Sequence, residues 1–186
     1  MRADAAKNYS RLLEVAREVV AEQGVDASLR DIARRADVGF ATLLRHFPTR
    51  DALLEALLRA GFDDLAVRAS RVDPEQDPGS ALAGWLRDFV ACAATYRGVV
   101  ELMTSALDDP ESALHDSCAA MKTAGSELLA RAQAAGAART DLDGIGLFGL
   151  AGAAAWIHSQ PALVAHADPL GALITDVIFD VPAKAT

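Results

Sequence analysis

Residues 28–50, SLRDIARRADVGFATLLRHFPTR, constrain the fold of this 186-residue chain more than any other segment, because they encode two short helices joined by a tight turn. The first helix would begin at Ser28, whose hydroxyl can accept a hydrogen bond from the backbone N–H of Asp31. The second would run from about Gly39 to His46 and stop just before a proline. Such a pair is typical of the helix-turn-helix, whose second helix enters the major groove of DNA. The segment therefore predicts DNA binding.

The apolar residues of this segment fall at helical spacing. Leu29, Ile32, Ala33 and Ala36 would form the buried side of the first helix. Val38, in the joint between the helices, would fill the point where they cross. The spacing thus predicts two amphipathic helices packed on a common core.

The segment and its flanks resemble the DNA-binding domain of the tetracycline-repressor (TetR) family of regulators. The residues that carry the resemblance are AREVVAEQG from Ala16, SLRDIARRADV from Ser28 and TLLRHFPTRDALLEAL from Thr42. The resemblance implies that residues 1–55 form a three-helix DNA-binding domain with a helix-turn-helix, in which a first helix braces the other two. Gly24 sits where that first helix should end, and a glycine there can adopt a left-handed backbone.

The chain departs from the family pattern at the second helix of the pair. Leu44 stands where the family usually has Tyr, Phe40 where a polar or basic residue is frequent, and Ala41 where Gly is frequent. Leu44 lacks a hydroxyl for a phosphate but can contact a thymine methyl. Phe40 can do the same or rest on the protein itself. A ligand-binding or scaffold dimer with a weakened DNA-binding head is therefore the alternative to a regulator.

Several side chains of the pair are candidate DNA contacts. Arg45 lies beside Thr42 and can donate two hydrogen bonds to a guanine edge, or contact a phosphate instead. Arg30 can reach a base or a phosphate, while His46 and Arg50 suit phosphate contacts. The full predicted DNA-binding set is Ser28, Arg30, Gly39, Phe40, Ala41, Thr42, Leu44, Arg45, His46 and Arg50.

Composition and charge agree with this interpretation. Alanine and leucine dominate while β-branched and aromatic residues are sparse, which predicts an all-α fold. The net charge of −8 is unevenly divided: residues 1–60 carry ten Lys and Arg against nine Asp and Glu, and the remainder carries eight against seventeen. DNA phosphates repel acidic surfaces, and this division keeps most of the negative charge away from the predicted DNA-binding domain.

The remainder of the chain predicts six further helices, punctuated by Pro, Gly and Asp. Their expected ranges are 49–71, 80–95, 99–107, 109–135, 141–159 and 168–179. The stretches ALAGWLRDFVACAATYRG from Ala81 and ELLARAQAAGAARTDLD from Glu127 resemble the C-terminal domain of the SbtR-like branch of the same family. That resemblance implies that residues 56–186 form a helical domain that binds an effector and dimerises.

A dimer is also expected from the residues themselves. The segment 144–156 is apolar on every side, and Gly144, Gly149 and Gly152 are small enough for another helix to approach closely. The alternative is that this helix is simply the core of the monomer. Two reading helices must also lie about 34–36 Å apart, or a multiple of this, to use both halves of an inverted repeat. A homodimer on such an operator is the predicted assembly.

The effector pocket is predicted from large apolar side chains in the second domain, each of which can equally be plain core. These candidates are Phe62, Trp85, Phe89, Cys92, Tyr96, Met103, Met121 and Trp156. An apolar pocket suggests a small hydrophobic or aromatic effector. Cys92 and Cys118 are expected to be buried structural thiols rather than a redox switch.

Other classes of function find little support in the sequence. The N-terminus lacks the apolar region of a secretory signal, and the longest strongly apolar run, 145–157, is too short to span a bilayer. The histidines and cysteines lack the spacing of a metal site, and no phosphate-binding loop or nucleophile elbow occurs. The sequence thus predicts a cytoplasmic, non-enzymatic protein without cofactor or metal, and most simply a repressor released by its effector. Activation of transcription, or DNA binding without an effector, is also compatible with it.

Overall fold

The computed structural model describes residues 2–24, 26–95 and 109–180, and every regular element in these ranges is a helix. The predicted all-α fold is confirmed. The chain divides into two compact units, residues 1–60 and 61–186. The assignment of separate functions to residues 1–55 and 56–186 stays a prediction.

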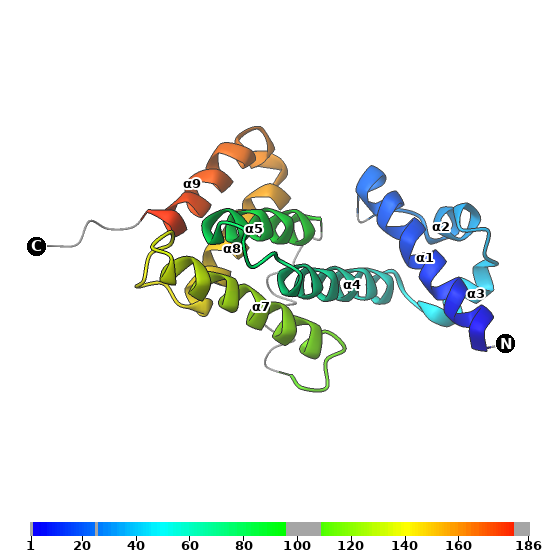
Figure 1. Ribbon diagram of the computed structural model, residues 1–186. Coiled ribbons are helices and arrows are strands. Elements are labelled where there is room, and N and C mark those ends of the chain that lie inside the picture. The colour runs from blue at the N-terminus through cyan, green and yellow to red at the C-terminus, as the bar shows by residue number, and fades with distance from the viewer. Residues whose placement is uncertain (1, 25, 96–108, 181–186) are drawn as a thin grey trace, which may run out of the picture. The chain divides into compact units, whose positions relative to one another are not determined.

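The first unit is built from α1 (Arg2–Gln23), α2 (Leu29–Arg35), α3 (Phe40–His46) and the start of α4 (Arg50–Ser70). Helices α1, α2 and α3 pack on one another (Figure 1). Their shared core contains the fully or almost fully buried side chains Leu12, Val15, Ala16, Val19, Val20, Ile32, Leu43 and Phe47. Burial of each large apolar side chain contributes about 1.5–3 kcal/mol, so this core holds the two short helices in place.

The ends of these helices bear out most of the local predictions. Gly24 follows α1 with φ +80°, the left-handed conformation expected there. The backbone N–H of Ala52 donates to Thr49 Oγ1 at 3.1 Å, so Thr49 caps α4, the helix expected to begin at residue 49. The joint between α2 and α3 turns at Asp37, whose φ is +54° and which the sequence did not single out.

The predicted side-chain cap at Ser28 is wrong. Ser28 does occupy the N-cap position of α2, but its hydroxyl makes no capping hydrogen bond. Its backbone carbonyl accepts from the N–H of Ile32 at 3.0 Å. The Asp31 carboxylate interacts with Arg34, Arg35 and Gln23. Ion pairs at helical spacing and a contact to α1 thus hold the Asp31 side chain, while the Ser28 hydroxyl does not cap the start of α2.

The second unit comprises the rest of α4, then α5 (Pro78–Ala94), α7 (His115–Ala134), α8 (Gly144–Ser159), the 3₁₀ helix η1 (Pro161–His166) and α9 (Ala167–Phe179). Helix α8 packs against α5, α7 and α9, and α5 also packs against α7 (Figure 1). Helix α8 is therefore central to this unit, which agrees with the alternative that it forms core of the monomer, and its role in a dimer stays a prediction.

Three predicted helix starts need correction. Helix α5 begins at Pro78 rather than Ser80, because the Asp77 carboxylate caps it by accepting from the Ser80 N–H at 2.8 Å. Helix α7 begins at His115 rather than Asp109, whose carboxylate instead accepts from the Glu111 N–H in a turn. Helix α8 begins at Gly144 rather than Asp141, with Asp143 as its cap. Carboxylate caps set the starts of α5 and α8, whereas the N-cap residue of α7 is Leu114, which makes no side-chain cap. The helix expected at 99–107 lies outside the described residues.

An aromatic cluster fixes the packing of α5, α7 and α8. The rings of Trp85, Phe89 and Phe148 lie with their centroids 5.7–6.0 Å apart. Trp85 Nε1 also donates to the Leu65 carbonyl at 3.0 Å. Gly125 of α7 makes room for these rings, since a Cβ there would lie 2.5 Å from Trp85 and 2.8 Å from Phe148. The close approach predicted for glycines of α8 occurs at Gly144, where a Cβ would collide with the Ser126 side chain of α7, but not at Gly149, where a Cβ would meet nothing within 4 Å.

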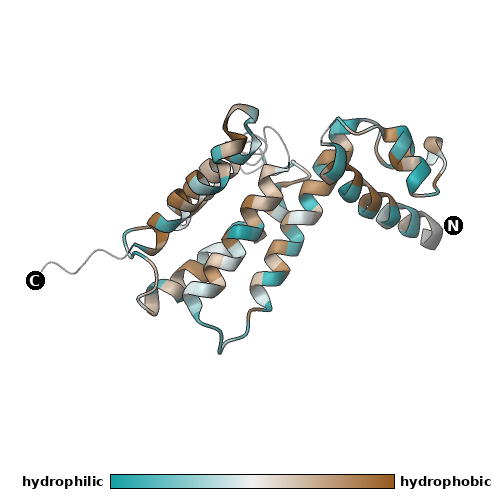
Figure 2. Cartoon of the chain, turned by 90° about the horizontal axis from the view of Figure 1, so that it is seen from above, coloured by the Kyte–Doolittle hydropathy of each residue, from teal (hydrophilic) through white to brown (hydrophobic). Residues whose placement is uncertain are grey.

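Helix α9 is apolar yet largely exposed. Figure 2 shows hydrophobic residues along this helix, which leads to the C-terminal end of the chain. Together with η1 it forms a segment, Pro161–Phe179, that is long and apolar enough to cross a membrane by length and composition alone, although only 17% of it is buried. The sequence had singled out 145–157 as the longest apolar run, so this longer segment was missed. A single segment of this kind is weak evidence for a membrane.

Candidate nucleic-acid interface and ligand groove

Helix α3 carries Arg45 on its exposed side and the fully buried Leu43 on the other. Arg45 Nη2 donates to Thr42 Oγ1 at 3.2 Å, and its Nε donates to the Ala41 carbonyl at 3.3 Å. Within the described part of the chain, Arg45 forms no ion pair. Its guanidinium is thus held along α3 by neutral acceptors and keeps its charge available to an anion or a base edge.

Arg30 of α2 and Phe40 of α3 form a pair that the sequence did not join. The guanidinium carbon of Arg30 lies 4.4 Å from the centroid of the Phe40 ring. Such a cation–π contact is worth about 0.5–1 kcal/mol at an exposed site. Phe40 stands at a position where polar or basic residues are frequent. Its ring contacts the protein and holds the Arg30 side chain of α2 close to the start of α3.

We expect Phe40→Leu to weaken DNA binding about two- to fivefold, because it removes the ring that orients Arg30. Phe40→Tyr keeps an aromatic face and should leave binding nearly unchanged. Fluorescence anisotropy measures the affinity of both variants for an operator sequence selected from a randomised DNA pool. If the pair acts as a unit, Phe40→Leu should add little to the loss caused by Arg30→Ala. Additive losses would show that Phe40 acts independently of Arg30.

Two predicted phosphate-binding residues, His46 at the end of α3 and Arg50 at the start of α4, have partners within the first unit. The His46 ring lies edge-on to Tyr9, with centroids 5.7 Å apart, and beside Phe47. Arg50 Nη1 lies 3.2 Å from Asp26 Oδ1. Both of these side chains are partly or fully exposed, but Arg50 would have to share its charge between Asp26 and a phosphate.

Two further arginines of α2 are neutralised by neighbouring carboxylates. Arg34 pairs with Asp31, while Arg35 lies 3.0 Å from Asp31 and 2.7 Å from Glu22. The hydrogen bond from Arg34 lowers the pKa of Asp31, and the hydrogen bond to Glu22 raises the pKa of Arg35. These pairs leave Arg30 and Arg45 as the more available cations of the pair of helices.

The remaining members of the predicted DNA-binding set lie at the surface of the same pair. Ser28 precedes α2, Gly39 is the N-cap residue of α3, and Ala41 is exposed in its first turn. Leu44 is 36% exposed, which is open enough for contact with a thymine methyl. The fold thus gathers all ten predicted residues in the segment from the start of α2 to the start of α4.

The predicted effector residues lie in several different surroundings, and their role in effector binding stays a prediction. Phe62, Trp85, Phe89 and Met121 are buried in the packed core, and Cys92 is half-buried. Trp156 is 49% exposed, while Tyr96 and Met103 lie outside the described residues. None of the described members of this set lines the groove found between α5, α8 and α9.

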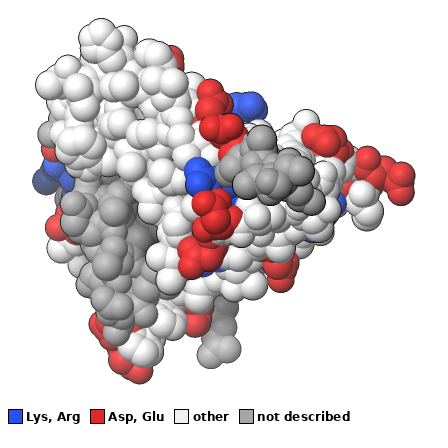
Figure 3. Space-filling view, turned by 90° about the vertical axis from the view of Figure 1, so that its left-hand side faces the viewer, with Lys and Arg blue, Asp and Glu red and all other residues white. Residues whose placement is uncertain are grey.

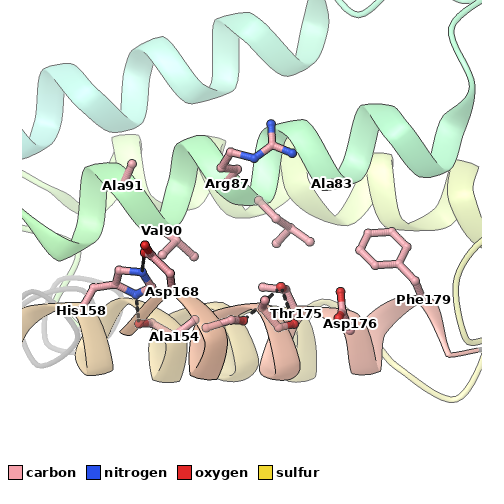
Figure 4. A pocket seen from close by; sticks show the side chains of 13 residues that line it. Ala83, Arg87, Val90, Ala91, Ala154, His158, Asp168, Thr175, Asp176 and Phe179 are labelled. Atoms are coloured by element: carbon pink, nitrogen blue, oxygen red, sulfur yellow. Dashed lines mark hydrogen bonds and ion pairs between the residues drawn. The ribbon is translucent and has the colours of Figure 1, made fainter. Parts of the chain in front are cut away.

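That groove has a volume of about 590 Å³ (Figure 4). Its walls come from one face of α5 and one face of α9, and its floor comes from α8. Its lining residues are Ala83, Leu86, Arg87, Val90, Ala91, Ala154, His158, Asp168, Gly171, Ala172, Thr175, Asp176 and Phe179. Sequence reasoning missed it because it looked for large apolar side chains, whereas small residues open the space. The sequence did contain an indication of the groove, because the small residues Gly171, Ala172 and Thr175 fall on one face of a helix.

The cysteines differ in their surroundings. Cys118 is fully buried, and burial raises the pKa of its thiol to about 11. Its reactive thiolate is therefore scarce at neutral pH, as expected for a structural residue. The Cys92 sulfur lies where a Cβ on Gly61 would come within 2.6 Å, so Gly61 allows α4 and α5 to approach closely there.

Comparison with known families assigns both parts of the chain. Residues 12–57 match the family described as bacterial regulatory proteins, tetR family. Residues 77–178 match the domain described as transcriptional regulator SbtR-like, C-terminal domain. None of the curated proteins compared with the chain matches it significantly.

Solved structures of TetR regulators resemble the whole chain. A TetR transcriptional regulator from Streptomyces coelicolor is 32% identical with a TM-score of 0.68, over 92% of this chain and 98% of that one. A TetR regulatory protein from Mycobacterium vanbaalenii is 35% identical with a TM-score of 0.64, over 96% and 98%. RolR, solved with resorcinol, shares the fold at 22% identity and a TM-score of 0.60, over 98% and 92%.

Proposed function

This chain belongs to the TetR family of DNA-binding transcriptional regulators, and we propose that it is a homodimeric repressor that a small molecule releases from an inverted-repeat operator. Regulators of this family bind DNA operators and ligands as dimers. The observation that carries the proposal is the exposed face of α3, where Arg45 lies beside Thr42 without a carboxylate partner among the described residues. The proposed DNA contacts are the ten residues of the predicted set.

Exposed apolar side chains on α8, η1 and α9 support a dimer. Ile145 and Trp156 on α8 are 76% and 49% exposed, and Leu173 and Val177 on α9 are 64% and 41% exposed. A Cβ on Gly149 would meet nothing within 4 Å. Figure 3 shows a broad area without visible Lys, Arg, Asp or Glu on one side of the molecule. A second copy of the chain would bury such a surface around a twofold axis.

We expect Leu173→Arg to dissociate this dimer. The substitution changes an exposed residue, so the fold of the protomer should survive, but a twofold axis would bring two such arginines into one apolar interface. Sedimentation should show the dimer dissociation constant rising by at least about tenfold. Val67→Arg is the matched control, since Val67 is 42% exposed but lies on α4. An unchanged dimer in the Leu173→Arg variant would place the interface elsewhere.

Helix α4 is the element through which an effector can act on DNA binding. It begins in the first unit and ends in the second, since the boundary between the units falls at residues 60 and 61. An effector that binds the DNA-free conformation more tightly than the DNA-bound one would stabilise a dimer whose two DNA-binding domains are spaced wrongly for the operator. Coupling of about 1–3 kcal/mol is typical of such linkage. The proposed site of action is the cytoplasm, where the operator is accessible.

Selection of bound sequences from a randomised DNA pool tests the proposal. An enriched inverted repeat, bound more weakly as salt rises, is the expected result. A folded dimer that enriches no sequence, even after refolding without ligand, would favour a ligand-binding dimer with a weakened DNA-binding head. Release of the enriched DNA by a small molecule would establish the effector response.

A further inference from the structure

The groove between α5, α8 and α9 has the dimensions of a small-molecule site. Its volume of about 590 Å³ falls within the range of about 300–1,000 Å³ that ligand pockets occupy. The space is open because Ala154 on α8 and Gly171 and Ala172 on α9 present little or no side chain. Leu173 and Val177 point from another face of α9, so a dimer formed through them uses a different surface.

The body of a ligand would meet apolar side chains. Leu86 and Val90 line the α5 wall, and the ring of Phe179 stands at one end of the groove (Figure 4). These groups favour an aliphatic or aromatic body of modest size, because burial of apolar surface drives its transfer from water.

The polar groups of the α9 wall can accept hydrogen bonds but have little to donate. The Thr175 hydroxyl already donates toward the carbonyls of Gly171 and Ala172, at 3.1 and 3.0 Å, so only its lone pairs remain. Asp176 faces the groove as an exposed carboxylate, and no side chain in the described ranges donates to it. A ligand at this wall must therefore supply the protons itself.

His158 does not reverse this pattern, because acceptors engage both of its ring nitrogens. Its Nδ1 lies 2.9 Å from the Ala154 carbonyl, and its Nε2 lies 3.3 Å from Asp168 Oδ1. Both ring nitrogens therefore face acceptors of the protein, and neither is directed at a ligand in the groove. Gly171 permits the arrangement, since a Cβ there would lie 2.6 Å from the imidazole.

Arg87 is the cation among the lining residues, and it lies on the opposite wall. In Figure 4 its side chain lies over α5 and does not cross toward α9. The apolar body and the accepting wall together select a cationic donor. We propose that this groove binds an organic amine whose body lies against Leu86, Val90 and Phe179 and whose ammonium group donates to Asp176 and Thr175.

This inference deepens the proposed function, because it names the chemical class of the effector and relies on that function for the regulatory role. Binding itself does not depend on DNA and can fail separately. Calorimetric titration of the full-length protein with n-octylamine and phenylbutylamine, and with octanoate and phenylbutanoate, measures the site directly. Both amines should bind more tightly than the acids of matching body.

Three variants locate the bound amine. Asp176→Asn keeps the shape of the side chain and should weaken amine binding about three- to fivefold, as expected for a partly exposed ion pair. Ala172→Phe should fill the groove and abolish binding. Asp116→Asn removes a carboxylate from the exposed side of α7 and should change nothing. Circular dichroism establishes that each variant is folded.

The outcomes separate the site from its regulatory role. Equal or tighter binding of the acids, no binding of either amine, or amine binding that Ala172→Phe leaves intact would each overturn the groove assignment. Amine binding that depends on Asp176, without release of the selected operator, would keep the site and reject the amine as effector. A protein that selects no operator but binds amines through Asp176 would reject the DNA-binding proposal alone.

Discussion

Replacing Arg45 by alanine is expected to weaken operator binding by at least about thirtyfold. A bidentate arginine–guanine contact is worth about 1–3 kcal/mol, and a dimer loses it in both half-sites. The exposed Arg45 guanidinium is positioned along α3 by the Thr42 hydroxyl and the Ala41 carbonyl, so it is ordered without being neutralised. Fluorescence anisotropy with the selected inverted repeat measures the loss, and a second DNA selection measures the change in sequence preference.

Two control variants distinguish base recognition from attraction by charge. Arg45→Lys keeps the charge but loses the bidentate hydrogen-bonding geometry of the guanidinium. If Arg45 contacts a base, this variant should lose sequence preference; if it contacts a phosphate, the sequence preference should be retained. Arg71→Ala removes an exposed arginine from the second unit and should leave affinity nearly unchanged. If Arg45→Ala binds the operator with unaltered affinity and preference, Arg45 does not belong to the interface.

The second large effect is expected in the core of the other unit. Gly125→Ala should lower the free energy of unfolding by about 1–3 kcal/mol, because its Cβ would clash with the rings of Trp85 and Phe148. Trp85 cannot easily retreat, since it is 4% exposed and its indole N–H donates to the Leu65 carbonyl. Urea denaturation followed by circular dichroism gives the change in stability.

The same substitution at Gly84 provides the matched control. A Cβ on Gly84 meets nothing within 4 Å, and Gly84 lies inside α5. Gly84→Ala should therefore stabilise the protein by about 0.5–1 kcal/mol, the usual gain when alanine replaces glycine within a helix. Equal effects of the two substitutions would show that α7 can shift away from the aromatic cluster at little cost.

The sequence predicted the first unit largely because its determinants are local. Gly24, Thr49 and the proline after α3 act within a few residues of the helix ends that they set. Periodic apolar residues then identified the face that becomes core. The failure at Ser28 was also local: Ser28 occupies the N-cap position and its carbonyl accepts from Ile32, but its hydroxyl makes no capping hydrogen bond.

The second unit shows the limit of such reasoning. Its family and its helical nature followed from sequence patterns, but the starts of α5 and α8 depended on which aspartate caps each helix, and α7 begins after a turn at Asp109 without a side-chain cap. Large apolar residues could not be assigned to a pocket or a core from sequence, because both use the same side chains. In the structure four of the predicted pocket residues are buried core.

The sequence by itself predicted an all-α chain with a helix-turn-helix head, because the short-range spacing of apolar and punctuating residues specifies those helices, and its resemblance to the TetR family predicted a regulator. Only the tertiary structure decided that Phe40 supports Arg30, that Gly125 accommodates the aromatic cluster, and that the groove lies between α5, α8 and α9. Each of these features joins residues from different helices. Their proximity depends on how the helices pack, which the periodicity of any single segment does not specify.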